Sequence, residues 1–283
     1  MSETGNRHAA LRAGCGKLIG EAQRGWLVSE TVQQEFLFGE QNGEAADRVE
    51  DVACTGAVPE VQVKSKDRVR DHGEVFTAER EVKAMVDLVG ETISEQSNRT
   101  VLEPACGDGN FLAEILRRKC ARVTQRRWRQ GQAEELAFDL STALSLLYGI
   151  DIMPDNAATC RERLAGILLD AFDSVIKGKD KPARIMLETA AKVIVGTNIV
   201  CGDALTMKTP DGAKPLVFVK WRAEKTRDRF FFGVTPYYFE TLVNGDDKGK
   251  GDLFEIREPL KASGRFPFHE IERIHDFMKG AMP

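Results

Sequence analysis

Short apolar runs separated by longer amphipathic stretches predict an α/β fold for this chain. We interpret the apolar runs near residues 100–104, 146–151, 198–201, 215–220 and 229–234 as buried strands. The stretch between the first two runs is long, and we interpret it as an extended or doubled helix. Two further helices are predicted by apolar residues at helical spacing: Val82, Met85, Val86 and Val89, and near the end of the chain Ile271, Ile274, Phe277 and Met278.

The run from Val101 to Leu112 is the most informative segment, because a strand ends in Glu103 and a glycine turn opens a helix. Glycines allow the backbone to approach a ligand, and the first N–H groups of the helix face whatever binds there. A dinucleotide fingerprint needs a third glycine where this chain has Leu112, which disfavours nicotinamide and flavin cofactors. A ligand without pyrophosphate and with a cationic amino-acid tail fits better, and S-adenosylmethionine is the obvious candidate.

Two aspartates follow later strands in the same way. Asp151 ends an apolar run, where a carboxylate can accept hydrogen bonds from both ribose hydroxyls. Asp203 follows the next run and could accept a hydrogen bond from the amino group of adenine. The alternative for each is a carboxylate that only caps the following helix.

The glycine segment, E-P-A-C-G-D-G-N-F-L, resembles motif I of the adenine-specific DNA methyltransferases, which commonly has the sequence D-P-A-C-G-S-G-N-F-L. Residues 71–78 resemble the G-E-x-F-T-P element that precedes the first helix in this family, with Ala78 in place of the proline. Residues 148–152 and 198–205 resemble the second-strand and third-strand motifs. The four segments occur in the order found in the modification subunits of type I restriction systems, and together they cover about residues 71–206.

The resemblance implies a doubly wound, Rossmann-like S-adenosylmethionine methyltransferase sheet and DNA as a partner. In the family, the element before the first helix lies against the methionine end of the cofactor, so Phe76 and Thr77 would be contacts there. The matched positions imply a cofactor site that consists of Phe76, Thr77, Glu103, Ala105, Gly107, Asp108, Gly109, Asn110, Phe111, Asp151, Ile152, Asp203 and Ala204.

The turn that should hold the target base is missing or degenerate. Methylation of an exocyclic amine requires an acceptor pair and a stacking aromatic ring, which the family supplies with N-P-P-Y or D-P-P-Y. No such tetrapeptide occurs, and the best candidates for catalytic residues are Thr235, Pro236 and Tyr238. A second candidate location is the strand that ends at Trp221, which has an aromatic ring but no acceptor. The alternative is that residues 235–238 are an ordinary strand followed by a proline turn.

The sheet is expected to be incomplete, because a doubly wound sheet of this type has more strands than the chain supplies. We expect an N-terminal helical appendage and linker at 1–70, a methyltransferase-like domain at 71–243, and a glycine-rich loop with a C-terminal helix at 244–283. The strands near 215–220 and 229–234 should be covered by residues 1–70 or by another chain, a specificity subunit or a second copy. The alternative is that the C-terminal stretch folds back over them.

The composition is that of an ordinary globular chain, with 283 residues, 42% hydrophobic and 30% charged, and a net charge of −4. Basic clusters at 64–70, 117–119 and 126–129 could face phosphates or could be solvated helix faces. The six cysteines show no C-x-x-C pairing, no apolar stretch is long enough for a membrane span, and the four histidines have no metal-ligand spacing. A reduced, cytoplasmic location without a membrane partner or a metal is expected.

Two functions from different classes remain open. The first is an enzyme that methylates the adenine amino group in DNA with a divergent amine-holding turn. The second is a catalytically inactive methyltransferase-fold subunit that acts in binding or regulation. Transfer of labelled methyl groups to DNA would distinguish them.

Overall fold

The structure is a computed structural model that describes residues 65, 68, 77–93, 99–129, 131–177, 180–227, 229–243 and 259–280, without the side chains of 89–93. The predicted N-terminal appendage lies outside the described residues apart from 65 and 68, and so does the glycine-rich loop at 244–258. Within the described part the fold is mixed α/β, as predicted, and every predicted strand is present.

The first three strands form a parallel sheet in the order β1-β2-β3. The strands are β1 (Val101–Glu103), β2 (Leu147–Asp151) and β3 (Ile199–Cys201). The central strand β2 pairs Gly149 with Glu103 on one side and with Ile199 on the other. Because all three strands run in the same direction, their carboxyl ends meet at one edge of the sheet.

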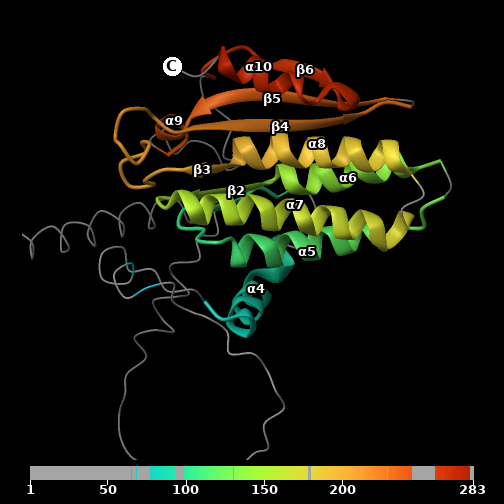
Figure 1. Cartoon of the computed structure of the whole chain (residues 1–283), viewed down its shortest axis with the longest axis horizontal. Coiled ribbons are helices and arrows are strands. Elements are labelled where there is room, and N and C mark those ends of the chain that lie inside the picture. Colours follow the sequence, from blue (N-terminus) through green and yellow to red (C-terminus); the bar gives the residue numbers. More distant parts are fainter. Residues whose placement is uncertain are drawn as a thin grey trace, which may run out of the picture.

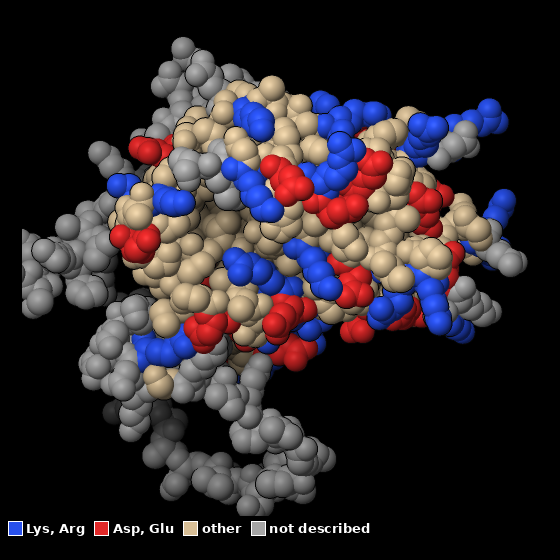
Figure 2. Space-filling model, turned by 45° about the horizontal axis from the view of Figure 1, so that its top comes forward, with Lys and Arg blue, Asp and Glu red and all other residues tan. Residues whose placement is uncertain are grey.

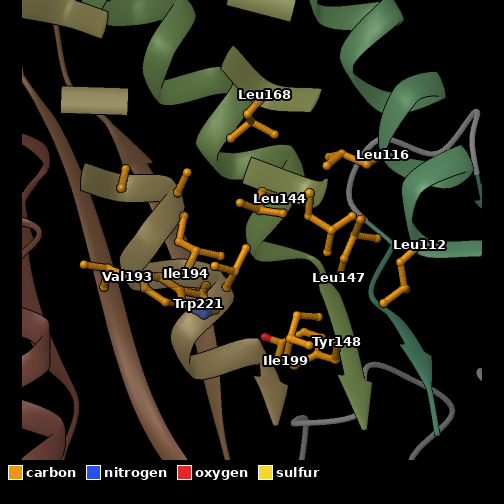
Figure 3. Close-up of a cluster of buried hydrophobic side chains, with 14 of the residues drawn as sticks. Leu112, Leu116, Leu144, Leu147, Tyr148, Leu168, Val193, Ile194, Ile199 and Trp221 are labelled. Atoms are coloured by element: carbon orange, nitrogen blue, oxygen red, sulfur yellow. The ribbon is translucent and has the colours of Figure 1, made fainter. Parts of the chain in front are cut away.

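Helices fill the connections, since parallel neighbours require long crossovers. α5 (Asn110–Thr124) and α6 (Ala133–Ser145) connect β1 to β2, α7 (Pro154–Ile176) and α8 (Lys181–Asn198) connect β2 to β3, and α4 (Glu79–Ile93) precedes β1. Figure 1 shows α5 to α8 packed together, with α4 beside α5. Figure 3 shows leucines of α5, α6 and α7 and the strand residues Leu147 and Tyr148 gathered in one core.

The helix predicted around residues 82–89 is confirmed as α4, since its side chains at helical spacing, Val82, Met85 and Val86, are buried. The side chain of Val89 lies outside the described residues. In α7, Cys160, Leu164 and Leu168 follow the same spacing and are fully buried. This stripe holds α7 against the parallel sheet and determines where its first turn lies relative to Asp151.

The remaining strands form a separate antiparallel sheet in the order β4-β5-β6. The strands are β4 (Val217–Lys225), β5 (Phe230–Tyr238) and β6 (Gly264–Pro267), and α9 (Phe239–Val243), the 3-10 helix η1 (Phe268–Glu270) and α10 (Arg273–Lys279) complete this region. β4 and β5 make a long hairpin in which Val217 pairs with Tyr238 and Lys225 with Phe230. β6 then pairs with β5, so the C-terminal segment follows the hairpin.

This hairpin was expected to be covered by residues 1–70 or by another chain; residues 1–64 lie outside the described residues, and the C-terminal segment covers one side of the hairpin. β6 pairs with the free side of β5, and Phe268, Ile271, Ile274 and Met278 are buried behind it. The alternative, in which the C-terminal stretch folds back, is the arrangement observed. The helix predicted in that stretch is confirmed as α10, with Ile274 and Met278 buried.

Buried polar contacts connect the two sheets. The hydroxyl of Tyr148 in β2 donates a hydrogen bond of 2.6 Å to the carbonyl oxygen of Val219 in β4. Nε1 of Trp221 in β4 donates a hydrogen bond of 2.8 Å to Oδ1 of Asn198 at the end of α8. These bonds hold the hairpin against the parallel sheet and the end of α8. Neither bond involves the residues at the carboxyl edge of the sheet.

Candidate functional site

The candidate site lies at the carboxyl edge of the parallel sheet, where the three sequence motifs meet. The sheet order places the turn after β1 and the end of β3 on either side of Asp151 at the end of β2. Asp203 lies two residues beyond the end of β3. In open α/β sheets, ligands bind in a crevice outside the carboxyl ends of the strands. The candidate residues of the second and third motifs are therefore at the correct edge for a nucleoside ligand.

The turn after β1 uses both motif glycines in a left-handed conformation. Gly107 has a φ of 53° and Gly109 a φ of 87°, values that favour glycine over any residue with a side chain. The next residue, Asn110, begins α5, and no side chain caps this helix. The first helical bond is made by the N–H of Ala113 to the carbonyl of Gly109. The preceding amides of Asn110, Phe111 and Leu112 therefore have no acceptor within the helix.

Close packing inside the protein also requires Gly109. A β-carbon at this position would lie 2.5 Å from Sγ of Cys160 in α7. The sequence interpretation, that the glycine lets the backbone approach a ligand, is therefore incomplete. Substitution of Gly109 would damage the packing of α5 on α7 and could not test ligand binding alone.

Asp151 is bonded to both of its neighbouring segments. Its Oδ2 accepts a hydrogen bond of 2.9 Å from the N–H of Gly107. Its Oδ1 accepts one of 2.8 Å from the N–H of Met153 and one of 3.2 Å from Nδ2 of Asn156. A carboxylate has about four acceptor positions, so these bonds do not by themselves exclude a ligand hydroxyl. Asp151 thus holds the glycine turn against the first turn of α7, while its role as an acceptor for ribose hydroxyls stays a prediction.

Asp108 has a buried carboxylate oxygen that lacks a partner. Its Oδ2 accepts a hydrogen bond of 2.9 Å from Nη2 of Arg163 in α7, whose Nη1 donates to Oδ1 of Asn110. Its Oδ1 is buried and accepts no hydrogen bond within the described part of the chain. An unsatisfied buried acceptor is costly, and a ligand with an N–H or ammonium group would satisfy it.

The segments that follow β2 and β3 present one further carboxylate and two apolar side chains. Oδ1 of Asp203 accepts hydrogen bonds from the N–H groups of Leu205 and Thr206. This oxygen therefore caps the segment that follows, as the alternative interpretation of Asp203 expected, although that segment is a turn and not a helix. Its Oδ2 has no partner among the described residues. Ile152 and Leu205 are 39% and 48% exposed, unusual values for large apolar side chains. Ala204, which directly precedes Leu205, is half-buried.

The other cofactor candidates differ in accessibility. Glu103 is buried at the end of β1, and Ala105 in the following turn is exposed. Phe111 is half-buried in the first turn of α5. Thr77 is half-buried just before α4, and Phe76 lies outside the described residues. The glycine turn and the strand ends are thus brought together, while the Phe76 contact with a cofactor stays a prediction.

Cys106, in the glycine turn, is a packing residue. It is buried, and a hydrogen bond with Cys160 together with burial raises the pKa of its thiol well above the ordinary value. A thiol with a raised pKa stays protonated at neutral pH and is a poor nucleophile. No cluster of His, Cys, Asp and Glu in the described part of the chain could hold a metal ion.

Residues 235–238 do not form the predicted proline turn. Thr235 pairs with Lys220, Pro236 with Val219 and Tyr238 with Val217 inside the continuous strand β5. The Thr235 hydroxyl is 2.6 Å from the hydroxyl of Ser263. The Pro236 carbonyl, which would have to hold the target amine, accepts a hydrogen bond from the N–H of Leu260. A strand within an antiparallel ladder cannot surround a flipped base, so this arrangement does not support a catalytic role for Thr235, Pro236 and Tyr238.

The basic clusters at 117–119 and 126–129 are largely paired with protein groups. Arg118 bonds to Glu114, and Arg126 forms an ion pair with Asp139 at 2.7 Å. Lys119 is buried and donates to a backbone carbonyl. Figure 2 shows Lys and Arg interspersed with Asp and Glu on the face in view, with no large region of one sign. These two clusters therefore resemble solvated helix faces more than a phosphate-binding surface.

Sequence reasoning missed Arg163 and Asn156, and it identified Arg68 only as a member of the basic cluster at 64–70. Arg163 contacts the glycine turn from the first half of α7, and no local pattern distinguishes it from the other arginines of the chain. Arg68 and Asn156 contact each other beside Asp151. Asn156 had one detectable signal, since it follows the strand-end acid by five positions and lies in the first turn of an amphipathic helix.

Comparison with known proteins adds no assignment. No protein-family model matches the chain, and no curated protein or solved structure matches it significantly. None of the described helices is both long enough and apolar enough to span a membrane.

Proposed function

We propose that this chain binds S-adenosylmethionine, or its demethylated product, at the carboxyl edge of the parallel sheet. The observation that carries the proposal is the parallel pairing of β1, β2 and β3, which brings the motif I turn, Asp151 and the Asp203 loop to one edge. Three features match such a ligand: the amides that begin α5, which have no acceptor within the helix, and Oδ1 of Asp108 and Oδ2 of Asp203, which have no hydrogen-bond partner among the described residues. The parallel sheet would then be the remaining core of a doubly wound methyltransferase sheet.

The packing of Leu112 favours this ligand over a dinucleotide. Leu112 is buried, and its Cδ1 would be 3.0 Å from a β-carbon at Gly149 in β2. In a dinucleotide-binding unit the helix carries the glycine that permits close packing on the strand. Here the strand carries the glycine and the helix carries a leucine. The first turn of α5 therefore packs on β2 through an apolar side chain, and this packing supports a ligand without pyrophosphate.

The chain is proposed to hold the cofactor without holding the target base. The residues that best resembled an amine-holding turn form the last part of β5, and their polar groups are bonded to Ser263 and Leu260. This arrangement favours a methyltransferase-fold subunit that acts in binding or regulation. The base-holding residues would come from a partner chain or from a second copy.

An active adenine methyltransferase is the second candidate, and one observation favours it. The sequence from Pro104 to Leu112 matches the adenine-specific motif at every position except Asp108. DNA is accordingly the acceptor to test. Incubation of the purified protein with duplex DNA and methyl-labelled S-adenosylmethionine should leave the DNA unlabelled under the binding proposal. Robust labelling by this chain alone would establish the enzyme instead.

Equilibrium dialysis with labelled S-adenosylmethionine tests the ligand class directly. Unlabelled S-adenosylhomocysteine should compete, because it keeps the adenosine and the amino-acid tail. A nicotinamide dinucleotide should not compete, since its pyrophosphate has no matching glycine turn. Competition by the dinucleotide alone would show that the glycine turn serves a different cofactor.

A further inference from the structure

We propose that Arg68 is a positioning residue that sets the affinity of the candidate site through Asn156 and Asp151. The inference rests on the proposed binding of an adenosine-type ligand by Asp151. Arg68 lies 83 positions before Asp151 in the sequence, in the basic cluster at 64–70 and outside the four segments that resemble methyltransferase motifs. Its guanidinium group is nevertheless one side chain away from the carboxylate that would accept the ribose hydroxyls.

Arg68 is fixed on the first turn of α7 by a two-pronged contact. Nη1 donates a hydrogen bond of 2.7 Å to Oδ2 of Asp155, and Nη2 donates one of 3.2 Å to Oδ1 of the same carboxylate. The Arg68 side chain is 20% exposed, so the pair is partly shielded from water. Two-pronged pairing between arginine and a carboxylate fixes the plane of the guanidinium group.

Nη2 of Arg68 also donates a hydrogen bond of 3.2 Å to Oδ1 of Asn156. This contact determines how the Asn156 amide is oriented. With its oxygen toward a cation, the amide must present Nδ2 on its other side, where it donates 3.2 Å to Oδ1 of Asp151. The reverse orientation would place NH₂ against the guanidinium and the amide oxygen against the carboxylate. Because Asn156 is buried, water cannot compensate for either repulsion.

The consequence is an ordered connection from Arg68 to the glycine turn. Arg68 orients Asn156, Asn156 and Met153 hold Oδ1 of Asp151, and Oδ2 remains on the N–H of Gly107. Without Arg68, the Asn156 amide can rotate and present an oxygen to the carboxylate. The Asp151 carboxylate would then turn away from the position in which it can serve a ligand.

A double-mutant cycle on ligand affinity tests this order. We expect Arg68→Met to raise the dissociation constant for S-adenosylhomocysteine about tenfold, and Asn156→Ala to raise it by a similar factor. The double variant should be no weaker than Asn156→Ala, because Arg68 acts through that residue. Arg184→Met is the matched control, since it breaks an ion pair with Asp173 away from the site. The control should bind within about twofold of the wild type.

Two affinity results would overturn the proposal. One is an unchanged dissociation constant in Arg68→Met. The other is a loss of roughly a hundredfold in the double variant, the product expected if the two residues act independently. Urea unfolding of each variant must accompany the titrations so that a loss of folded protein is not counted as a loss of affinity.

A second readout does not depend on the ligand. The side-chain amide resonances of Asn156, assigned by their absence in Asn156→Ala, should shift or broaden in Arg68→Met and stay unchanged in Arg184→Met. An unchanged pair of resonances in Arg68→Met would overturn the positioning role even if the wild type binds S-adenosylhomocysteine. Altered resonances in a wild type that binds no ligand would instead show that the proposed function has failed while Arg68 still orients the amide.

Discussion

The thiol of Cys160 fills the space beside Gly109, where an added β-carbon would lie 2.5 Å from its Sγ. Gly109 also has a φ of 87°, which residues with side chains rarely adopt. The same glycine therefore satisfies a backbone requirement and a packing requirement. Both requirements exist without a ligand, so they predict effects on stability that are independent of function.

We expect Gly109→Ala to lower the free energy of unfolding by about 2–4 kcal/mol, through backbone strain and overpacking together. Gly131→Ala is the matched control, because Gly131 has a φ of 86° and nothing lies within 4 Å of an added β-carbon. Only the strain term, about 1 kcal/mol, should appear there. Urea unfolding monitored by circular dichroism measures both values. Equal losses at the two glycines would contradict the packing argument.

Cys160→Ala should partly rescue Gly109→Ala. Removing Sγ relieves the contact at 2.5 Å, but the Cβ of residue 160 would still lie 3.2 Å from the new methyl group. We expect the Gly109→Ala loss to shrink by about 1–2 kcal/mol in the Cys160→Ala background, measured by the same unfolding experiment. Strictly additive losses would show that the two side chains do not compete for space.

Asp151→Asn should destabilise the protein more than Asp203→Asn does. Both oxygens of Asp151 accept hydrogen bonds from protein N–H groups, so an amide NH₂ must face a donor in either orientation. Asp203 uses only Oδ1, and its amide nitrogen can take the place of the unpartnered Oδ2. We expect losses of about 1–3 kcal/mol for Asp151→Asn and under about 0.5 kcal/mol for Asp203→Asn in urea unfolding. The reverse order would contradict the assigned hydrogen bonds.

Lys119 should make the stability depend on pH. Burial, together with the nearby charge of Arg122, lowers the pKa of its amine from 10.5 to about 8. Between these values the unfolded chain binds more protons than the folded chain, so the free energy of unfolding rises with pH in this window. Relative to Lys119→Met, the wild type should gain about 2–3 kcal/mol between pH 7 and pH 10. Parallel pH profiles of the two proteins in urea unfolding would contradict the lowered pKa.

The hydrogen bond between the two sheets gives a further stability test. Tyr148→Phe leaves the Val219 carbonyl without its 2.6 Å donor, and we expect a loss of about 1–3 kcal/mol. Tyr238→Phe makes the same chemical change at a half-buried hydroxyl with no hydrogen bond in the described part of the chain. It should cost under about 0.5 kcal/mol. Differential scanning calorimetry of both variants measures the effect, and equal costs would contradict it.

The sequence predicted the strands of the parallel sheet and the edge that carries the candidate site because the relevant signals are local. A buried central strand has to be continuously apolar, as Leu147 to Ile150 are, and a left-handed turn requires glycines such as Gly107 and Gly109. The carboxyl edge then follows from the direction that parallel strands share. Burial of Val82 and Val86 in α4 follows equally from their helical spacing.

The pairing of the later strands could not be predicted, because it depends on distant contacts. Pro236 indicated a turn, yet the β5–β6 ladder ends at Val234 and Gly264, before it reaches the proline. The carbonyl of Pro236 points to that side, toward Leu260, so its missing N–H removes no bond to β4. β6 is only four residues long and has no apolar alternation. The contacts of Arg68 and Arg163 also join positions remote in the sequence, and composition cannot identify them.

Calorimetric titration of S-adenosylhomocysteine into the wild type and Asp108→Asn tests the central claim most directly. In Asp108→Asn the amide oxygen can still face Arg163, which places NH₂ where the unpartnered buried Oδ1 lies. We expect saturable binding by the wild type and roughly tenfold weaker binding by Asp108→Asn, with at most about 1 kcal/mol lost in unfolding. A folded wild type that binds neither this ligand nor S-adenosylmethionine at millimolar concentration would contradict the claim.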